Sequence, residues 1–150
     1  MRIVIQRVSK AAVSINGNIF SSIEKGLLIL LGIEVNDSIE DAQKLVSKIV
    51  KLRIFGDENG QMNLSNTDVN GEYLVISQFT LHAETKKGNR PSYIKAARPE
   101  QAIPLYEKFI ELLKQESGKE ISTGEFGADM KVELINDGPV TIQIDSKNWD

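Results

Sequence analysis

Short stretches of alternating hydrophobic and polar residues run through the chain, a pattern typical of β-strands that bury one face. Two strands are predicted near the start, over residues 3–8 and 13–15, and the chain then returns through residues 19–23. Asn16-Gly17 precedes the returning segment, and this pair favours a tight hairpin because both residues tolerate positive φ angles. The first part of the chain therefore predicts antiparallel strands.

Two further segments have the character of strands. Residues 27–31 are continuously apolar between two glycines, which predicts a strand buried on both faces. Residues 72–81 predict another strand, in which alternate side chains share a face. One face of that strand is expected to carry Gln78, Thr80 and His82.

Apolar residues recur with helical spacing in two segments. The first helix is expected to begin at Ser38, with Asp41 placed as in a capping box, and to end near Leu52. The second is expected to begin near Pro99 and to stop at Gly118. Inside the second helix, Pro104 is expected to kink or delay it, because proline lacks the N–H group that the helix needs.

The last part of the chain alternates again over residues 130–134 and 140–144, which predicts two antiparallel strands joined across Gly138-Pro139. The elements together predict one α+β domain over residues 1–150, with a curved antiparallel or mixed sheet or a barrel-like core and two main helices.

Composition narrows the possible functions. The chain has 150 residues, a net charge of −3 and no cysteine, which fits a cytoplasmic protein without disulfide bonds. Its longest apolar run, residues 27–33, is far shorter than the roughly 20 residues that a membrane-spanning helix needs. With one histidine and no glycine-rich phosphate loop, the sequence predicts no metal and no cofactor.

Three hydrogen-bonding residues interrupt the apolar strand in Ser77-Gln78-Phe79-Thr80-Leu81. Polar residues at positions where apolar ones would fold more easily are typical of working sites. Thr80 with His82 as its base forms a candidate nucleophile–base pair. The alternative is that Thr80 is an ordinary strand residue and His82 a solvated strand end.

A basic segment follows, without an acidic residue among its cations, and it contains Tyr93, which could stack on a base. It predicts an RNA-binding surface, and the alternative is a solvated loop. Its cationic residues are Lys86, Lys87, Arg90, Lys95 and Arg98.

Gly138-Pro139 also has two interpretations. About 5–6% of X–Pro bonds in folded proteins are cis, so a trans bond is the ordinary expectation. A cis bond would instead form a tight turn whose carbonyl groups point in one fixed direction and test the shape of a ligand.

These segments together resemble the D-aminoacyl-tRNA deacylase family along essentially the whole chain. Residues 2–8 resemble the family's first strand, and residues 52–55 with Met62-Asn63 its middle segment. The two signatures are similar to residues 77–81 and 136–141, with residues 87–92 and 123–130 filling the intervals in the family's order.

The resemblance implies hydrolysis of the ester that joins a D-amino acid, or glycine mischarged on tRNA(Ala), to the terminal adenosine of tRNA. It implies a homodimer with packed sheets, in which a cis Gly138-Pro139 enters the partner's pocket and excludes L-amino acids sterically. The tRNA acceptor end is the expected partner, with no DNA and no membrane. Catalysis is expected to depend on backbone oxyanion donors near Phe79-Thr80, and the tRNA 2′-hydroxyl is a further candidate.

The resemblance assigns the residues of this site to three roles. The catalytic segment is Ser77, Gln78, Phe79 and Thr80. The residues for substrate binding and chiral selection are Gly138, Pro139, Arg7, Phe126, Ala128 and Met130. The tRNA-binding residues are Lys86, Lys87 and Arg90. A non-catalytic RNA-binding module and a general esterase that uses Thr80 and His82 are the alternative functions.

Overall fold

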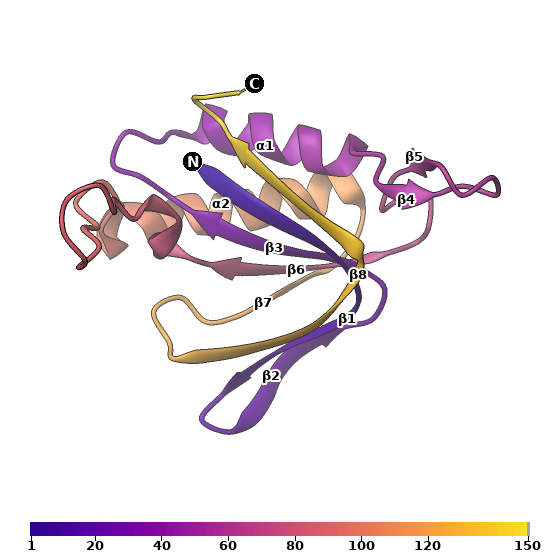
Figure 1. Cartoon of the computed structure of the whole chain (residues 1–150), viewed down its shortest axis with the longest axis horizontal. Coiled ribbons are helices and arrows are strands. Elements are labelled where there is room, and N and C mark those ends of the chain that lie inside the picture. The colour runs from indigo at the N-terminus through magenta and orange to yellow at the C-terminus, as the bar shows by residue number, and fades with distance from the viewer. Residues whose placement is uncertain (150) are drawn as a thin grey trace.

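The computed structural model describes residues 1–149, whose strands form a strongly curved sheet with two helices on one side (Figure 1). The strands of this sheet are β1 (Arg2–Ile15), β2 (Asn18–Ile23), β3 (Gly26–Gly32), β6 (Glu72–Ser77), β7 (Ile121–Thr123) and β8 (Met130–Asp145). The other elements are α1 (Ile39–Lys51), the short ribbon of β4 (Phe55–Gly56) and β5 (Met62–Leu64), the 3₁₀ turn η1 (Phe79–His82) and α2 (Pro99–Ser117).

The sheet is mixed and nearly closed. Its order is β2-β1-β3-β6-β7, and β8 also pairs with β1. The pairs of β1 with β2, β3 and β8 are antiparallel, whereas β3–β6 and β6–β7 are parallel. The central strand β3 is almost wholly buried, as its apolar run predicts. The α+β class with a barrel-like sheet and two helices is therefore confirmed.

The predicted break in the first strand is wrong, because β1 is one strand. Its exposed residues Ser9 and Lys10 interrupt the alternation of apolar residues, yet the backbone goes on pairing with β8. The register shifts between Gln6 and Lys10 and absorbs the irregularity. The Asn16-Gly17 turn is as predicted, with φ angles of 53° and 79°.

The end of the chain differs from the prediction in the same way. Residues 130–134 and 140–144 are not two antiparallel strands but two parts of β8, and both pair with β1. Gly138-Pro139 is cis and lies where β8 bends, opposite the register shift of β1. Proline removes a backbone donor from the ladder, and a bulge accommodates that loss.

The predicted strand over residues 72–81 is too long. β6 ends at Ser77, and η1 follows, so Gln78, Thr80 and His82 do not share a strand face. Gly32 allows this change of direction, because a Cβ there would lie 2.9 Å from the Gln78 carbonyl oxygen and 3.1 Å from the His82 ring. The turn thus packs directly on the end of β3.

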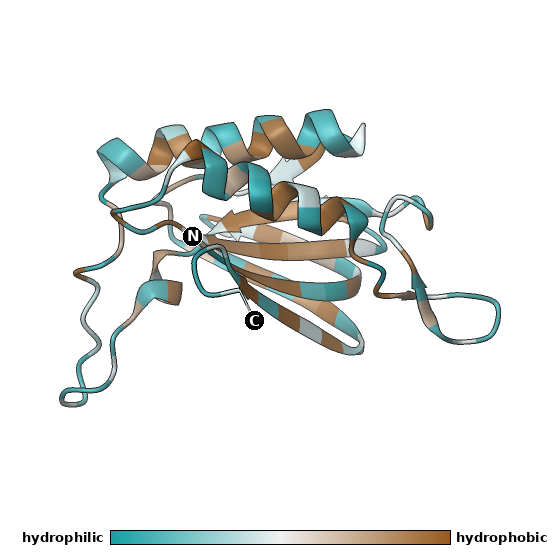
Figure 2. Cartoon of the chain, turned by 90° about the horizontal axis from the view of Figure 1, so that it is seen from above, coloured by the Kyte–Doolittle hydropathy of each residue, from teal (hydrophilic) through white to brown (hydrophobic). Residues whose placement is uncertain are grey.

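Both helices cover the sheet with their apolar sides, the brown positions of Figure 2. Ser38 caps α1, and its N–H group donates to the Asp41 carboxylate at 2.9 Å, as the capping box predicts. The C-cap residue of α1 is Leu52. The helix α2 runs from Pro99 to Ser117, with Gly118 as its C-cap residue, and it is continuous through Pro104, so the expected delay is absent.

The main core fills the space between the helices and the sheet. Its largest buried side chains include Tyr73, Phe109, Leu27, Ile29 and Leu45. Over residues 1–149, neither helix combines the length and the apolar character needed to cross a membrane.

Candidate functional site

A cavity of about 260 Å³ lies beyond the end of β6 and brings two distant segments of the chain together. Ser77, Gln78 and Phe79 form one side, and residues 126–130, from the loop after β7 and the start of β8, form another. The rest of its lining comprises Leu31, Ile33, Ile76, Ala97, Ala102 and Val132. A volume of this order is near the lower end of the range for small-molecule sites.

The first wall exists because the sheet stops there. The Gln78 N–H group donates to the Leu31 carbonyl at 2.8 Å and continues the contact with β3 beyond the end of β6. The chain then turns into η1, so the N–H groups of Phe79 and Thr80 leave the sheet ladder and have no partner inside their own turn. The side chain of Phe79 is 54% exposed although it lines the cavity.

The opposite wall is held by close packing. A Cβ on Gly124 would collide with the Met130 sulfur, so glycine allows Met130 to lie against the loop. The rings of Phe126 and Tyr106 meet edge-on, with their centroids 5.9 Å apart. The Tyr106 hydroxyl in turn donates a hydrogen bond to the Val75 carbonyl of β6 at 3.1 Å. Burial raises the pKa of Tyr106 to about 12, so its phenol stays protonated and keeps this wall attached to the sheet.

The Thr80–His82 pair does not form. The Thr80 hydroxyl accepts a hydrogen bond from the Gln78 side-chain amide, and neither ring nitrogen of His82 makes a hydrogen bond to the described residues. The alternative of a solvated His82 is also wrong, because its residue is only 2% exposed. The strand alternation that suggested the pair ends at Ser77.

His82 lies under η1 beside a group of charges. Its Nδ1 atom is 3.4 Å from the Glu34 carboxylate, which Lys147 contacts at 2.9 Å. Burial lowers the pKa of His82, and nearby Arg2 acts in the same direction, whereas the Gly32 backbone and Glu34 act against it. His82 is therefore a neutral packing residue beneath the turn that carries Phe79 and Thr80.

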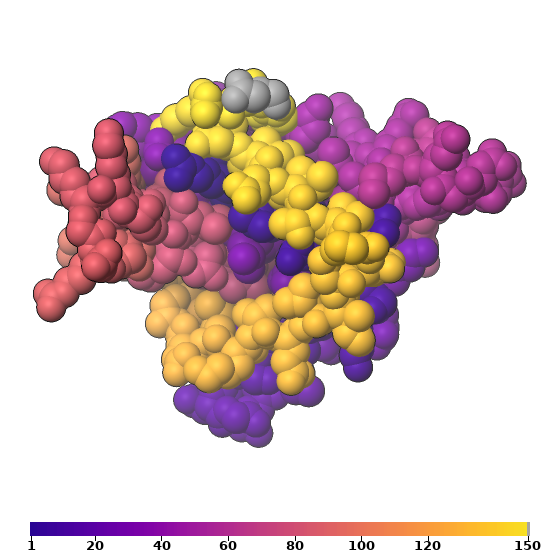
Figure 3. Space-filling model, viewed as in Figure 1, coloured from indigo at the N-terminus to yellow at the C-terminus, as the bar shows by residue number. Residues whose placement is uncertain are grey.

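The basic segment forms a loop that projects from the end of the molecule where the cavity lies, salmon in Figure 3. Two hydrogen bonds between the backbones of Glu84 and Ser92 close it, at 2.8 and 3.0 Å. The ammonium group of Lys95 is paired with Glu84 at 2.6 Å. The exposed residues Lys86, Lys87 and Arg90 make no ion pair within residues 1–149.

Gly138-Pro139 lies at the other end of the first part of β8. At about 3.3 Å per residue, Gly138 is roughly 26 Å along β8 from Met130, which lines the cavity. The Arg7 guanidinium donates to the Asp137 carbonyl at 2.8 Å and to the Ile54 carbonyl at 2.6 Å. Within one chain, the Gly138-Pro139 bend is therefore distant from the cavity, and Arg7 fixes the position of the bend.

The sequence patterns pointed to Ser77, Gln78 and Phe79 and, through the resemblance, to Phe126, Ala128 and Met130, and all six line the cavity. Thr80 lies on the adjoining turn but does not line it. Gly32 and Tyr106 were missed; the only signal for Gly32 was its place at the end of an apolar run. No group of three histidine and acidic residues in residues 1–149 could hold a metal ion.

Comparison with known proteins identifies the family. The profile described as D-Tyr-tRNA(Tyr) deacylase matches residues 4–145. The chain belongs to this family. It is 67% identical over 148 residues to a D-aminoacyl-tRNA deacylase of Bacteroides fragilis and 63% identical to one of Flavobacterium johnsoniae, with 99% of each protein covered. The family predicted from the sequence, and with it the class of hydrolases, is confirmed.

Solved structures show the same fold in the family. A structure described as "c-Myc DNA Unwinding Element Binding Protein" is 41% identical, with a TM-score of 0.91 and coverage of 97% of this chain and 98% of that one. A probable eukaryotic D-amino acid tRNA deacylase has a TM-score of 0.82 at 13% identity, with coverage of 95% and 97%, and shows that the fold persists at low identity.

Proposed function

We propose that the protein hydrolyses the ester bond of D-aminoacyl-tRNA and releases the free D-amino acid and tRNA. The observation that carries this proposal is the cavity in which Ser77-Gln78-Phe79 meets residues 126–130. Both segments belong to the pattern that the chain shares with the deacylase family. Because its substrate would be aminoacyl-tRNA, we expect the protein to act in the cytoplasm.

The reaction needs little machinery. Water adds to the ester carbonyl carbon and the bond to the ribose oxygen breaks. One proton of the water passes to the departing ribose oxygen, and the other is released to solvent as the amino acid becomes a carboxylate. We assign stabilisation of the transient oxyanion to the N–H groups of Phe79 and Thr80, which η1 withdraws from the sheet ladder. The 2′-hydroxyl of the terminal adenosine is a candidate for positioning the water.

Thr80 is not assigned as the nucleophile. Its hydroxyl accepts a hydrogen bond from the Gln78 side-chain amide, and the ring nitrogens of His82 make no hydrogen bond to it. An aminoacyl ester is more reactive than an amide, so placed water and oxyanion donors suffice. Thr80 would hold Gln78 at the cavity edge.

Chiral selection requires a second copy of the chain, because Gly138 lies far from its own cavity. The exposed residues Leu134 and Ile135 lie between the cavity end of β8 and Gly138. A two-fold axis near these residues would bring Gly138 of each chain to the cavity of the other. We therefore propose a homodimer in which the carbonyl groups of Gly138-Pro139 leave no room for an L side chain.

Glycine bears no side chain on either face, so steric exclusion of L residues does not reject it. The proposed site therefore also accepts glycyl-tRNA, including glycine mischarged on tRNA(Ala). Lys86, Lys87 and Arg90 would contact the phosphates of the acceptor end without gripping the whole tRNA.

The test is deacylation of D-Tyr-tRNA and L-Tyr-tRNA by the purified protein, measured side by side. Rapid loss of the D ester with retention of the L ester is expected. Loss of both esters would contradict steric exclusion by Gly138-Pro139. Loss of neither would overturn the proposed activity and favour an RNA-binding module.

A further inference from the structure

Two aromatic side chains are exposed at the edge of the cavity. Phe79 is 54% exposed and Tyr93 39%. The rings of Phe79 and Tyr93 meet edge-on with their centroids 5.1 Å apart, although they come from η1 and from the far side of the basic loop. We call Phe79 and Tyr93 the aromatic surface.

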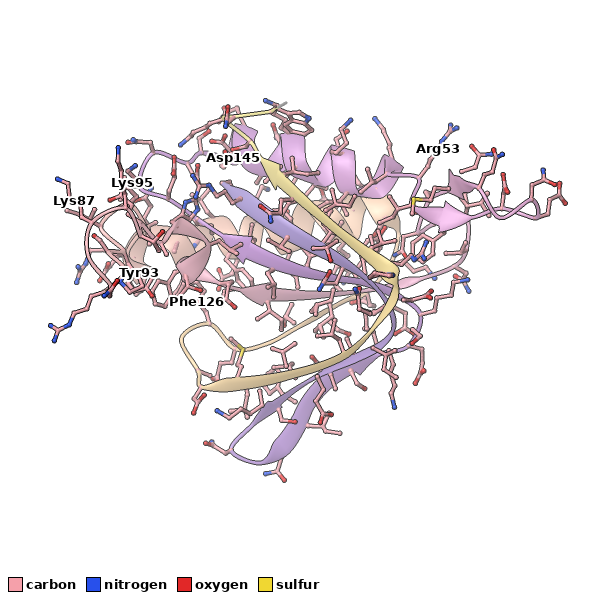
Figure 4. The ribbon with its side chains drawn as sticks, in the orientation of Figure 1. Arg53, Lys87, Tyr93, Lys95, Phe126 and Asp145 are labelled. Carbon is pink, nitrogen blue, oxygen red and sulfur yellow. The ribbon has the colours of Figure 1, made fainter. Side chains whose placement is uncertain are left out.

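The aromatic surface continues the cavity outward. Phe79 belongs to both, because it lines the cavity and contacts Tyr93. In Figure 4 the labelled Tyr93 lies at the same end of the molecule as Phe126, whereas Arg53 lies at the opposite end. A ligand that extends out of the cavity past Phe79 therefore reaches Tyr93.

The charges around the aromatic surface favour an anionic partner. The loop that delivers Tyr93 also carries Lys86, Lys87 and Arg90, whose exposed side chains are free of ion pairs within residues 1–149. Lys95, by contrast, is paired with Glu84. Exposed aromatic rings beside unpaired cations suit single-stranded nucleic acid, because bases stack on the rings while the cations follow the phosphates.

We infer that the aromatic surface binds the unpaired nucleotide that precedes the terminal adenosine, with its base stacked on Tyr93. This inference rests on the proposed function, which puts the terminal adenosine at the cavity. It assigns Tyr93 to recognition of a single-stranded RNA end.

The backbone supports a fixed position for Tyr93. The Glu84–Ser92 hydrogen bonds close the loop immediately before Tyr93, and the Ala96 N–H group donates to the Tyr93 carbonyl at 3.0 Å. After it, the Lys95 carbonyl accepts a hydrogen bond from the Val35 N–H group at 3.0 Å. The ring is therefore presented by an anchored turn, so little ordering is needed when a base stacks on it.

The experiment measures binding without turnover. The probe is an RNA hairpin that mimics the acceptor end, with 2-aminopurine directly before the terminal adenosine and no amino acid attached. Wild-type protein is expected to quench its fluorescence by stacking. Tyr93→Ala should weaken binding about tenfold and abolish the quenching, whereas Tyr93→Phe should keep both.

Phe20→Ala is the matched control, because Phe20 is 53% exposed but lies on the β2 hairpin. It should bind and quench like the wild type. Unchanged quenching in Tyr93→Ala, or quenching lost equally in Phe20→Ala, would overturn the inference. Quenching that decreases as the protein dimerises would also overturn it, because the aromatic surface would then be buried against a second copy of the chain.

Kinetics separate this inference from the proposed function. Tyr93→Ala should raise the KM for D-Tyr-tRNA about tenfold and should raise the KM for D-Tyr-adenosine less, because the shorter ester lacks the stacked nucleotide. An equal rise for both esters would mean that Tyr93 acts on the cavity through Phe79. A wild-type protein that quenches the probe but hydrolyses neither ester would refute the proposed activity alone.

Discussion

Gly138 illustrates how closely the backbone is fitted at the bend of β8. Its φ angle is 141°, and a Cβ there would lie 2.8 Å from the Arg7 guanidinium and 2.8 Å from the Val140 side chain. The same guanidinium holds the Asp137 carbonyl. Any side chain at position 138 therefore displaces Arg7 and moves the carbonyl groups of the bend.

Gly138→Ala is expected to lower the rate of D-Tyr-tRNA deacylation about 100-fold, the order of loss that follows a shift of about 1 Å in a positioned group. The rate is measured in single turnover with saturating protein. Gly17→Ala is the control, since Gly17 also has a positive φ, of 79°, but a Cβ there meets nothing within 4 Å. Equal losses in both variants would show that backbone conformation alone, and not the contact with Arg7, matters.

Some single residues were informative in the sequence and others were not. Asn16-Gly17 predicts a tight turn and Ser38 predicts a helix cap from local chemistry alone, and the structure confirms both. The sequence around His82 does not indicate that His82 is buried. Its burial depends on the packing of η1 on the end of β3, which Gly32 allows. Local patterns cannot report such a contact between distant segments.

At the scale of elements, the errors share one cause. Strand boundaries were read from alternation within a segment, whereas the real boundaries depend on the partner strand. β1 persists through Ser9-Lys10 because β8 pairs with it there, and β8 persists past Gly138-Pro139 for the same reason. β6 stops although alternation continues, because its neighbour β3 ends at Gly32. The helices were predictable because their hydrogen bonds are internal.

His82→Phe tests the anchoring of η1 through pH. Burial lowers the pKa of His82 in the folded protein, while the unfolded value is about 6.5. Between these two values the unfolded chain binds more protons, so the free energy of unfolding falls as the pH drops below about 6.5 and is unaffected above it. Phenylalanine also carries a planar aromatic ring but cannot be protonated, so the variant should lose less stability between pH 7 and 5.

Thermal unfolding of both proteins at each pH measures the difference. Glu34 and the guanidinium of Arg2 face His82, and both remain in the variant. The hydrogen bond from Lys147 lowers the pKa of Glu34 below its ordinary value of 4.5, so Glu34 titrates below this pH window. Parallel curves of melting temperature against pH would contradict a buried, neutral His82.

In the whole molecule, the proposed site is divided between the two ends of one segment of β8. The cavity lies at Met130 and the bend proposed to select chirality lies at Gly138, with exposed apolar residues between them. This division is the reason that a dimer is proposed. The sequence resemblance suggested the dimer, but a single chain contains no contact that tests it.

Leu134→Glu is expected to shift the protein from dimer to monomer and to lower D-Tyr-tRNA deacylation at least tenfold, because it would bury a charge at the proposed two-fold axis. Sedimentation at micromolar concentration gives the oligomeric state. Met62→Glu is the control, since Met62 is also exposed, at 56%, but lies on β5. A Leu134→Glu protein that is monomeric and fully active would rule out a bend supplied by a partner.

The pairing of β1 with β8 has a consequence for biosynthesis. Arg2 and Asp145, which are 143 residues apart, are joined at 2.8 Å, and the wall of the cavity at Met130 belongs to the same late strand. At about 5–20 residues per second, a ribosome leaves β1 without this partner for on the order of ten seconds. During that time β1 presents an unpaired edge, the kind of surface through which nascent chains aggregate. The working site is thus among the last parts of the protein to form.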